Sequence, residues 1–175
     1  QPCSSAASDV YKRQIVNSLR IKNWIKCELE ASLILYFTGI SRKSSEIIED
    51  QTTNIQLGKN KSLEAMHKMR SQAKRMKEAL ICGDLETFCN SLNEGWEAKK
   101  SSSKSVSNEY IEEIYKSAIE SGATAGKLSG AGGGGFMLFY SPPEKKGDVI
   151  RNLQVFGGKI YDFHFTEQGC QAWTV

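Results

Sequence analysis

The chain has 175 residues, of which 39% are hydrophobic and 25% are charged, so it can form one domain with a hydrophobic core, and its composition excludes collagen-like and wholly disordered proteins. The 23 lysines and arginines exceed the 20 aspartates and glutamates by three, too small a surplus to indicate a nucleic-acid or membrane partner. The five cysteines contain no Cys-x-x-Cys pair, so we expect free thiols and a cytoplasmic protein.

The first fourteen residues differ in character from the rest of the chain. They are polar and rich in serine and alanine, and they lack the apolar segment of a signal peptide. Apolar patterning begins abruptly at Ile15. We therefore expect residues 1–14 to be a non-native leader and residues 15–175 to form the domain.

The first regular elements are expected between residues 15 and 48. Residues 15–21 alternate between apolar and polar types, and a mixed segment follows. The run LILYFTG at residues 33–39 is rich in aromatic and β-branched types and ends in glycine, which predicts a buried strand and a turn. Ser41 can then cap a helix through Ile47 and Ile48.

Three amphipathic helices are predicted in the middle of the chain, around a serine-rich loop at residues 101–107. Gly83 ends the first helix, Asp84 caps the second, and Gly122 ends the third. The stripes that we expect to face the core are Leu63, Met66, Met69 or Arg70, Ala73, Met76 and Leu80; Leu85, Phe88, Cys89, Leu92 and Trp96; and Ile111, Ile114, Tyr115, Ala118 and Ile119.

The last third of the chain predicts strands and one helix. Residues 136–140 read as a continuous buried strand that Pro142 stops, and residues 144–156 suit a helix. Residues 160–165 and 171–175 alternate like the two arms of a hairpin. The order of elements predicts an α+β fold in which helices pack against a mostly antiparallel sheet.

The segment GATAGKLSGAGGGGF at residues 122–136 carries the chemistry of the chain. Consecutive backbone N–H groups in a glycine turn can form a concavity that attracts phosphate or carboxylate oxygens. A helix is expected to precede this segment and a buried strand to follow it, which argues against a flexible linker. We therefore expect an ordered anion-binding loop.

Two familiar glycine motifs do not fit this segment. Gly130, Gly132 and Gly135 match G-x-G-x-x-G, but a dinucleotide fingerprint needs a strand before it and a helix after it. The string GATAGKL has one spacer too few for a P-loop, and Leu128 stands where a P-loop needs serine or threonine.

The string KLSGAGGGGFMLFY at residues 127–140 resembles the third conserved motif of the GHMP kinases, a superfamily of small-molecule kinases. The string LILYFTGISRKSSEIIEDQ at residues 33–51 is similar to the branch of that family that phosphorylates sugars. The resemblance implies a ferredoxin-like C-terminal domain. It also implies transfer of the γ-phosphoryl group of ATP to a sugar hydroxyl, for this branch the anomeric hydroxyl of a heptose 7-phosphate.

In this family the main phosphate loop, of the type Pro-x-x-x-Gly-Leu-Gly-Ser-Ser, and the catalytic and magnesium-binding residues belong to an N-terminal domain. The sequence contains no Gly-Leu-Gly-Ser-Ser. We therefore expect the C-terminal half of such a kinase, with no catalytic or Mg²⁺-binding residues of its own, inactive alone and dependent on that N-terminal domain. Residues expected to support the ATP phosphates are Lys127, Gly130, Ala131, Gly132, Gly133 and Gly134, and Arg42 is expected to contact the sugar phosphate.

Two other functions stay open at this point. A ferredoxin-like fold also suits a non-catalytic binding or regulatory module, because fold does not determine function. The chain could also be a subunit that docks on a separate N-terminal polypeptide. Tyr161, Phe163 and Phe165 alternate as in an RNA-binding sheet, but the low net charge argues against that partner.

Overall fold

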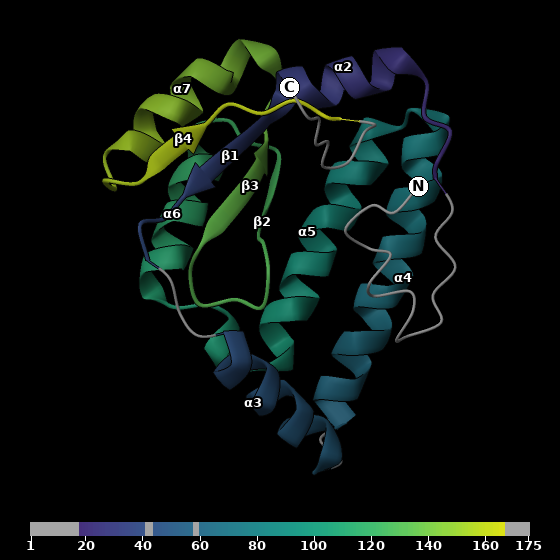
Figure 1. The fold of residues 1–175 in the computed structure, drawn as a ribbon, viewed down its shortest axis with the longest axis vertical. Coiled ribbons are helices and arrows are strands. Elements are labelled where there is room, and N and C mark those ends of the chain that lie inside the picture. The colour runs from purple at the N-terminus through teal and green to yellow at the C-terminus, as the bar shows by residue number, and fades with distance from the viewer. Residues whose placement is uncertain (1–17, 41–43, 58–59, 167–175) are drawn as a thin grey trace, which may run out of the picture.

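The computed structural model describes residues 18–40, 44–57 and 60–166 (Figure 1). Two long helices stand beside a small sheet, and further helices cover the other side of that sheet (Figure 1). The helices are α2 (Asn23–Ser32), α3 (Ser44–Gln56), α4 (Asn60–Cys82), α5 (Leu85–Ser102), the 3₁₀ helix η1 (Lys104–Val106), α6 (Glu109–Glu120) and α7 (Pro143–Gln154). The strands are β1 (Leu33–Phe37), β2 (Ala125–Leu128), β3 (Phe136–Tyr140) and β4 (Lys159–Tyr161).

The four strands form one antiparallel sheet in the order β2-β3-β1-β4. Leu33 of β1 lies opposite Tyr140 of β3, and Phe37 lies opposite Phe136 at the other end. Helices α3 to α6 connect β1 to β2, and α7 connects β3 to β4. This is the β-α-β-β-α-β arrangement of a ferredoxin-like fold, so the predicted α+β architecture is confirmed.

Strands β1, β2 and β3 send side chains into two hydrophobic clusters on opposite faces of the sheet, as the pleat of a strand requires. Tyr36 and Phe139 face the cluster that α6 and α7 complete with Ile111, Ile114, Val149 and Leu153. Leu33 and Tyr140 face the opposite cluster, to which α2 and α5 contribute Ile25, Leu29, Phe88 and Leu92. The sheet is therefore held between two layers of helices.

The predicted stripes of α5 and α6 are confirmed. Every predicted stripe residue of α5 is buried, and the Asp84 carboxylate accepts a hydrogen bond from the Thr87 N–H at 2.9 Å, which caps the helix. In α6, Ile111, Ile114 and Ala118 are fully buried.

The predicted stripe of α4 is confirmed only in part, because Met76 and Leu80 pack against the core but the buried positions lie about one residue earlier. Leu63 is 48% exposed, whereas the buried positions carry small or polar side chains. This helix packs along α5, where the Cβ of Gln72 lies 3.7 Å from a Cβ built on Gly95, so small side chains let the two helices approach closely. The buried positions of α4 are Ser62, Ala65, Gln72 and Ala79.

The serine-rich segment at residues 101–107 is not the loop that its composition predicts. Helix α5 continues to Ser102, and Ser103 caps η1 by accepting a hydrogen bond from the Ser105 N–H at 3.1 Å. Val106 is fully buried in the core. The segment is a packed junction that brings α5 into contact with the start of α6.

Three further expectations change at the sheet. The segment at residues 125–128, read as part of the glycine loop, is strand β2. The mixed segment before β1 is helix α2. Strand β4 stops at Tyr161, because residues 162–166 continue without sheet pairing, and the second arm at 171–175 lies outside the described residues.

Within the described part of the chain, no helix has the length and hydropathy needed to cross a membrane. Cys27, Cys82 and Cys89 are free thiols, and the first two are exposed. Burial raises the pKa of Cys89 to about 12, so that thiol is unreactive at neutral pH.

Candidate functional site

The glycine loop occupies residues 129–135 and joins the antiparallel strands β2 and β3. The Ser129 N–H donates to the Phe136 carbonyl oxygen at 2.8 Å and closes its base. A strand precedes the loop where the sequence predicted a helix, so Lys127 lies on β2. A second strand follows the loop, so the rejection of the dinucleotide fingerprint stands.

Two positions of the loop require glycine because another backbone comes close. Gly132 has a φ of +135°, and a Cβ built there would lie 2.7 Å from the Val106 carbonyl oxygen. Gly134 has a φ of +155°, and its Cβ would lie 2.6 Å from the Ile40 carbonyl oxygen. The loop therefore packs, backbone against backbone, on η1 and on the segment after β1.

Hydrogen bonds fix the loop to both of these neighbours. The Gly133 N–H donates to the Val106 carbonyl oxygen at 2.8 Å, and the Gly135 N–H donates to the Ile40 carbonyl oxygen at 2.7 Å. The Thr38 hydroxyl and N–H both donate to the Gly135 carbonyl oxygen, at 3.0 and 2.9 Å. The loop is therefore ordered, as its flanks suggested.

Four N–H groups of the loop have no acceptor among the described residues: those of Gly130, Ala131, Gly132 and Gly134. These belong to the residues that we expected to support a phosphate. Gly133 was also expected to do so, but its N–H is already bonded to Val106. The loop can therefore offer backbone donors to an anion.

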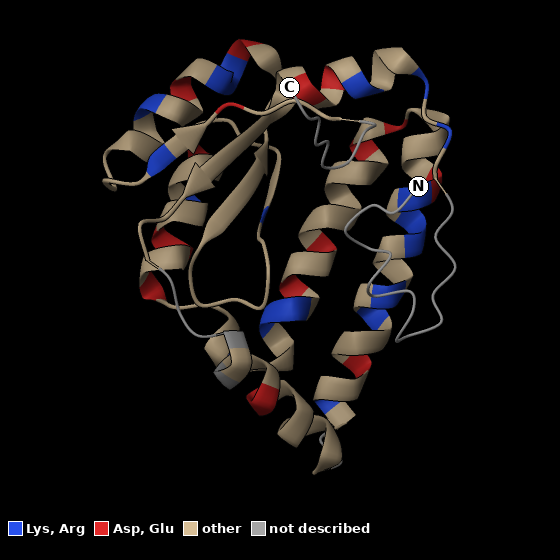
Figure 2. Cartoon of the chain, viewed as in Figure 1, with Lys and Arg blue, Asp and Glu red and all other residues tan. Residues whose placement is uncertain are grey.

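Lys99 of α5 holds the loop from the side of β2. Its ammonium donates to the Gly130 carbonyl oxygen and, at 3.5 Å, to the Leu128 carbonyl oxygen. Burial, together with the positive charge of Lys127, lowers the pKa of Lys99 from 10.5 to about 8. Figure 2 shows a cationic position on β2 and a cationic turn lower down on the neighbouring helix α5. Sequence reasoning missed Lys99, because nothing in the chain marks its approach to the loop.

The lowered pKa predicts how stability depends on pH. Between pH 8 and 10.5 the unfolded chain binds the Lys99 proton more tightly than the folded chain, so the contribution of Lys99 to stability rises with pH. The test compares the unfolding free energies of the wild type and of Lys99→Met. We expect the wild-type value minus the variant value to rise by about 2 kcal/mol from about pH 7 to about pH 10. Urea unfolding at several pH values measures it. The matched control is Lys116→Met, which removes an exposed charge on α6. The difference in unfolding free energy between the wild type and this control should not change with pH.

Asn108 joins the loop to the N-terminus of α6. Its Oδ1 accepts from the Ile111 N–H at 3.1 Å, and its Nδ2 donates to the Gly133 carbonyl oxygen at 3.4 Å. We expect Asn108→Ala to lower the unfolding free energy by about 1 to 2 kcal/mol.

Asn108→Asp is the matched variant, because it keeps the capping oxygen and removes the donor to Gly133. It should lose less than half as much stability in the same urea titration. Equal losses in the two variants would mean that the cap contributes nothing.

Arg42, the expected contact for the sugar phosphate, lies outside the described residues. Within the described ranges no group of three His, Cys, Asp or Glu side chains could hold a metal ion. The residues around the loop therefore fit a phosphate group, through N–H and ammonium donors, and they do not form a Mg²⁺ site.

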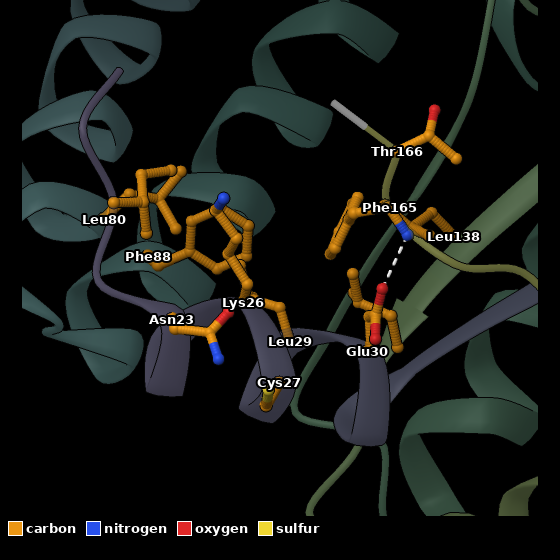
Figure 3. Close-up of a pocket in the computed structure, with 12 residues that line it drawn as sticks. Asn23, Lys26, Cys27, Leu29, Glu30, Leu80, Phe88, Leu138, Phe165 and Thr166 are labelled. Atoms are coloured by element: carbon orange, nitrogen blue, oxygen red, sulfur yellow. Dashed lines mark hydrogen bonds between the residues drawn. The ribbon is translucent and has the colours of Figure 1, made fainter. Parts of the chain in front are cut away.

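A cavity of about 680 Å³ lies away from the glycine loop (Figure 3). Its walls are mostly apolar, and the Phe165 N–H donates to Glu30 at 2.6 Å across one side. No residue of the glycine loop lines it, so the two features are separate. The labelled wall residues include Asn23, Leu29, Leu80, Phe88 and Leu138.

Residues 76–157 match the family model described as the GHMP kinases C terminal. The chain carries a GHMP kinase C-terminal domain. It is 49% identical over 164 residues to the D-glycero-alpha-D-manno-heptose 7-phosphate kinase of Campylobacter jejuni, a match that covers 94% of this chain and 48% of that protein. The chain thus spans about half the length of this relative.

Solved structures agree with the GHMP kinase C-terminal domain. A D-glycero-D-manno-heptose 1-phosphate kinase from Bacteroides thetaiotaomicron is 36% identical with a TM-score of 0.63, over 92% of this chain and 41% of that one. A Leishmania major mevalonate kinase, 21% identical, shares the fold with a TM-score of 0.67 over 74% of this chain and 40% of that one. The string at residues 127–140, which resembles the GHMP glycine motif, runs from the end of β2 through the loop to β3.

Proposed function

We propose that the chain is the C-terminal portion of an ATP-dependent sugar kinase that phosphorylates a heptose 7-phosphate. The observation that carries this proposal is the ordered glycine loop, whose backbone donors fit a phosphate, in a chain 49% identical to a heptose 7-phosphate kinase. In this proposal residues 15–175 form the domain, and residues 1–14 do not belong to it.

The proposed role of the loop is to stabilise charge. Phosphoryl transfer depends on positioning and on donors directed at the phosphoryl oxygens. The N–H groups of Gly130, Ala131, Gly132 and Gly134 would supply such donors, and Gly133 would support them by anchoring the loop on Val106. Lys127 would add positive charge, and Arg42 would contact the sugar phosphate. Mg²⁺, whose ligands we assign to the N-terminal half, would neutralise charge on the ATP phosphates.

A chimera tests this proposal. Residues 15–175 would replace the matching region of the Campylobacter jejuni kinase, and ADP release would be measured with D-glycero-D-manno-heptose 7-phosphate and with unphosphorylated heptose. We expect turnover that requires the 7-phosphate. We expect none from the 175-residue chain alone or from the N-terminal part of the relative alone.

A folded chimera without turnover would contradict the assignment as a kinase. Turnover with heptose but not with its 7-phosphate would contradict the substrate. Equal turnover of the chimera and of the 175-residue chain alone would contradict the need for the N-terminal half.

A further inference from the structure

A second, smaller cavity lies between α4, α5 and β2. Its volume is about 170 Å³, less than the ~300 Å³ at which pockets for whole drug-sized ligands begin. Lys99 separates it from the glycine loop, because this side chain both lines the cavity and bonds to the Gly130 carbonyl oxygen. The lining residues are Met69, Gln72, Ala73, Met76, Leu92, Gly95, Trp96, Lys99 and Lys127.

Two of these side chains carry a buried polar atom that has no hydrogen-bond partner among the described residues. The first is the indole Nε1 of Trp96, a donor on a side chain only 1% exposed. The second is Oε1 of Gln72, an acceptor on a side chain 7% exposed. Because the Gln72 Nε2 donates to Glu94 at 2.9 Å, the oxygen is the atom left unbonded. Unsatisfied buried groups are rare and costly in native proteins.

Two lysine side chains, Lys99 and Lys127, line the same cavity. Neither Lys99 nor Lys127 has a carboxylate within ion-pair distance among the described residues, although each repels the other. Lys100, next in the chain, shows the contrast, because it pairs with Glu97 at 2.8 Å and Glu112 at 3.0 Å. Lys99 has three N–H donors, of which the backbone carbonyls take two.

We propose that this cavity binds a phosphate group that keeps one proton. Its oxygens accept from the Trp96 N–H and from the two lysine ammonium groups, and its P–OH donates to the Gln72 Oε1. Hydrogen phosphate and a protonated phosphate monoester both present this pattern, whereas sulfate lacks the hydroxyl. The site includes Lys127, which the proposed function also places near the ATP phosphates, but it is distinct from the N–H groups of the glycine loop and does not rest on the proposed kinase function.

Calorimetric titration of the 175-residue chain at neutral pH tests the proposal with inorganic phosphate, sulfate, heptose 7-phosphate and ATP. We expect saturable binding of phosphate that is tighter than that of sulfate. Lys127→Met and Trp96→Phe should each weaken it by about tenfold or more. Lys116→Met, which removes the same charge from an exposed position on α6, should leave it unchanged.

The ligand series separates the possible sources of the phosphate. Equal affinity for phosphate and heptose 7-phosphate would support a site for the free ion, and tighter binding of the sugar phosphate would support a site for its terminal group. Either result supports the proposal only if Lys127→Met and Trp96→Phe also lose phosphate affinity.

The indole N–H resonance of Trp96, assigned by its absence in Trp96→Phe, gives a readout in the wild-type chain that does not depend on the stability of a variant. It should move on addition of phosphate and not on addition of sodium chloride. No saturable binding, an unmoved resonance, or equal binding of sulfate and phosphate would overturn the proposal and leave a cavity that holds water.

Discussion

Replacing Gly132 with alanine is expected to lower the free energy of unfolding by about 2 to 4 kcal/mol. The new Cβ would lie 2.7 Å from the carbonyl oxygen and 2.8 Å from the Cα of Val106, and the φ of +135° is strained for any L side chain. Backbone atoms cannot move aside as a flexible side chain can, so the loop must separate from η1. Urea unfolding followed by circular dichroism measures the loss.

Gly130→Ala is the matched control. Gly130 also has a positive φ, +74°, but a Cβ built there meets no atom within 4 Å. Gly130→Ala should lower the free energy of unfolding by about 1 kcal/mol, because only the left-handed backbone conformation is strained. If both alanines cost the same, the close approach of the loop to Val106 would not exist in solution.

Truncating Phe139 to alanine is expected to cost about 3 to 5 kcal/mol. Phe139 is fully buried in the middle of β3, and its ring lies 6.2 Å from that of Tyr115 on α6. The truncation leaves a cavity between the sheet and its helices. Val155→Ala, at a position 82% exposed, should change stability by less than about 0.5 kcal/mol.

A double-mutant cycle with Gly126 makes this prediction specific. A Cβ on Gly126 would lie 2.5 Å from the Phe139 ring, so Gly126→Ala alone should cost about 1 to 3 kcal/mol through overpacking. In the Phe139→Ala background the added methyl enters empty space and should cost much less. Additive losses of stability in the two variants would contradict the contact between Gly126 and the Phe139 ring. If Phe139→Ala does not fold, Phe139→Leu takes its place in the cycle.

The sequence predicts those elements whose local signals agree with their packing. Helix α6 has an asparagine cap, a regular apolar stripe and a terminal glycine, and the structure buries that stripe against the sheet. Strand β3 is a continuous apolar run, and it lies in the interior of the sheet. In both elements the local sequence signals and the tertiary packing favour the same structure.

The missed elements owe their structure to partners distant in the chain. Strand β2, with the sequence AGKL, has no β-branched residue, and it pairs along β3 while Asn93 of α5 binds its backbone. The Asn93 Oδ1 accepts from the Gly126 N–H at 3.2 Å, and its Nδ2 donates to the Thr124 carbonyl oxygen at 3.0 Å. Helix α2 has no side-chain cap, and buried Ile25 and Leu29 fix it against the core.

The candidate site also contains some residues that the sequence predicts and others whose role depends on tertiary structure. The glycines that could donate to a phosphate were evident from the sequence, because glycine is the residue for a close backbone approach. Lys99, Asn108 and Val106, which hold the loop, were not evident. Each acts on the loop from a position more than twenty residues earlier in the chain, so its role depends on tertiary structure.

The glycine loop presents main-chain atoms, and at four of the five positions from 130 to 134 it has no side chain to exchange. Substitution can break such a loop, but it cannot gradually adjust which molecule the loop prefers. If the proposed sugar kinase function holds, selectivity among sugars must come from other segments, where side chains can vary without disturbing the main chain. Exchanging those segments between related kinases, with the loop kept constant, is the practical route to changing the substrate.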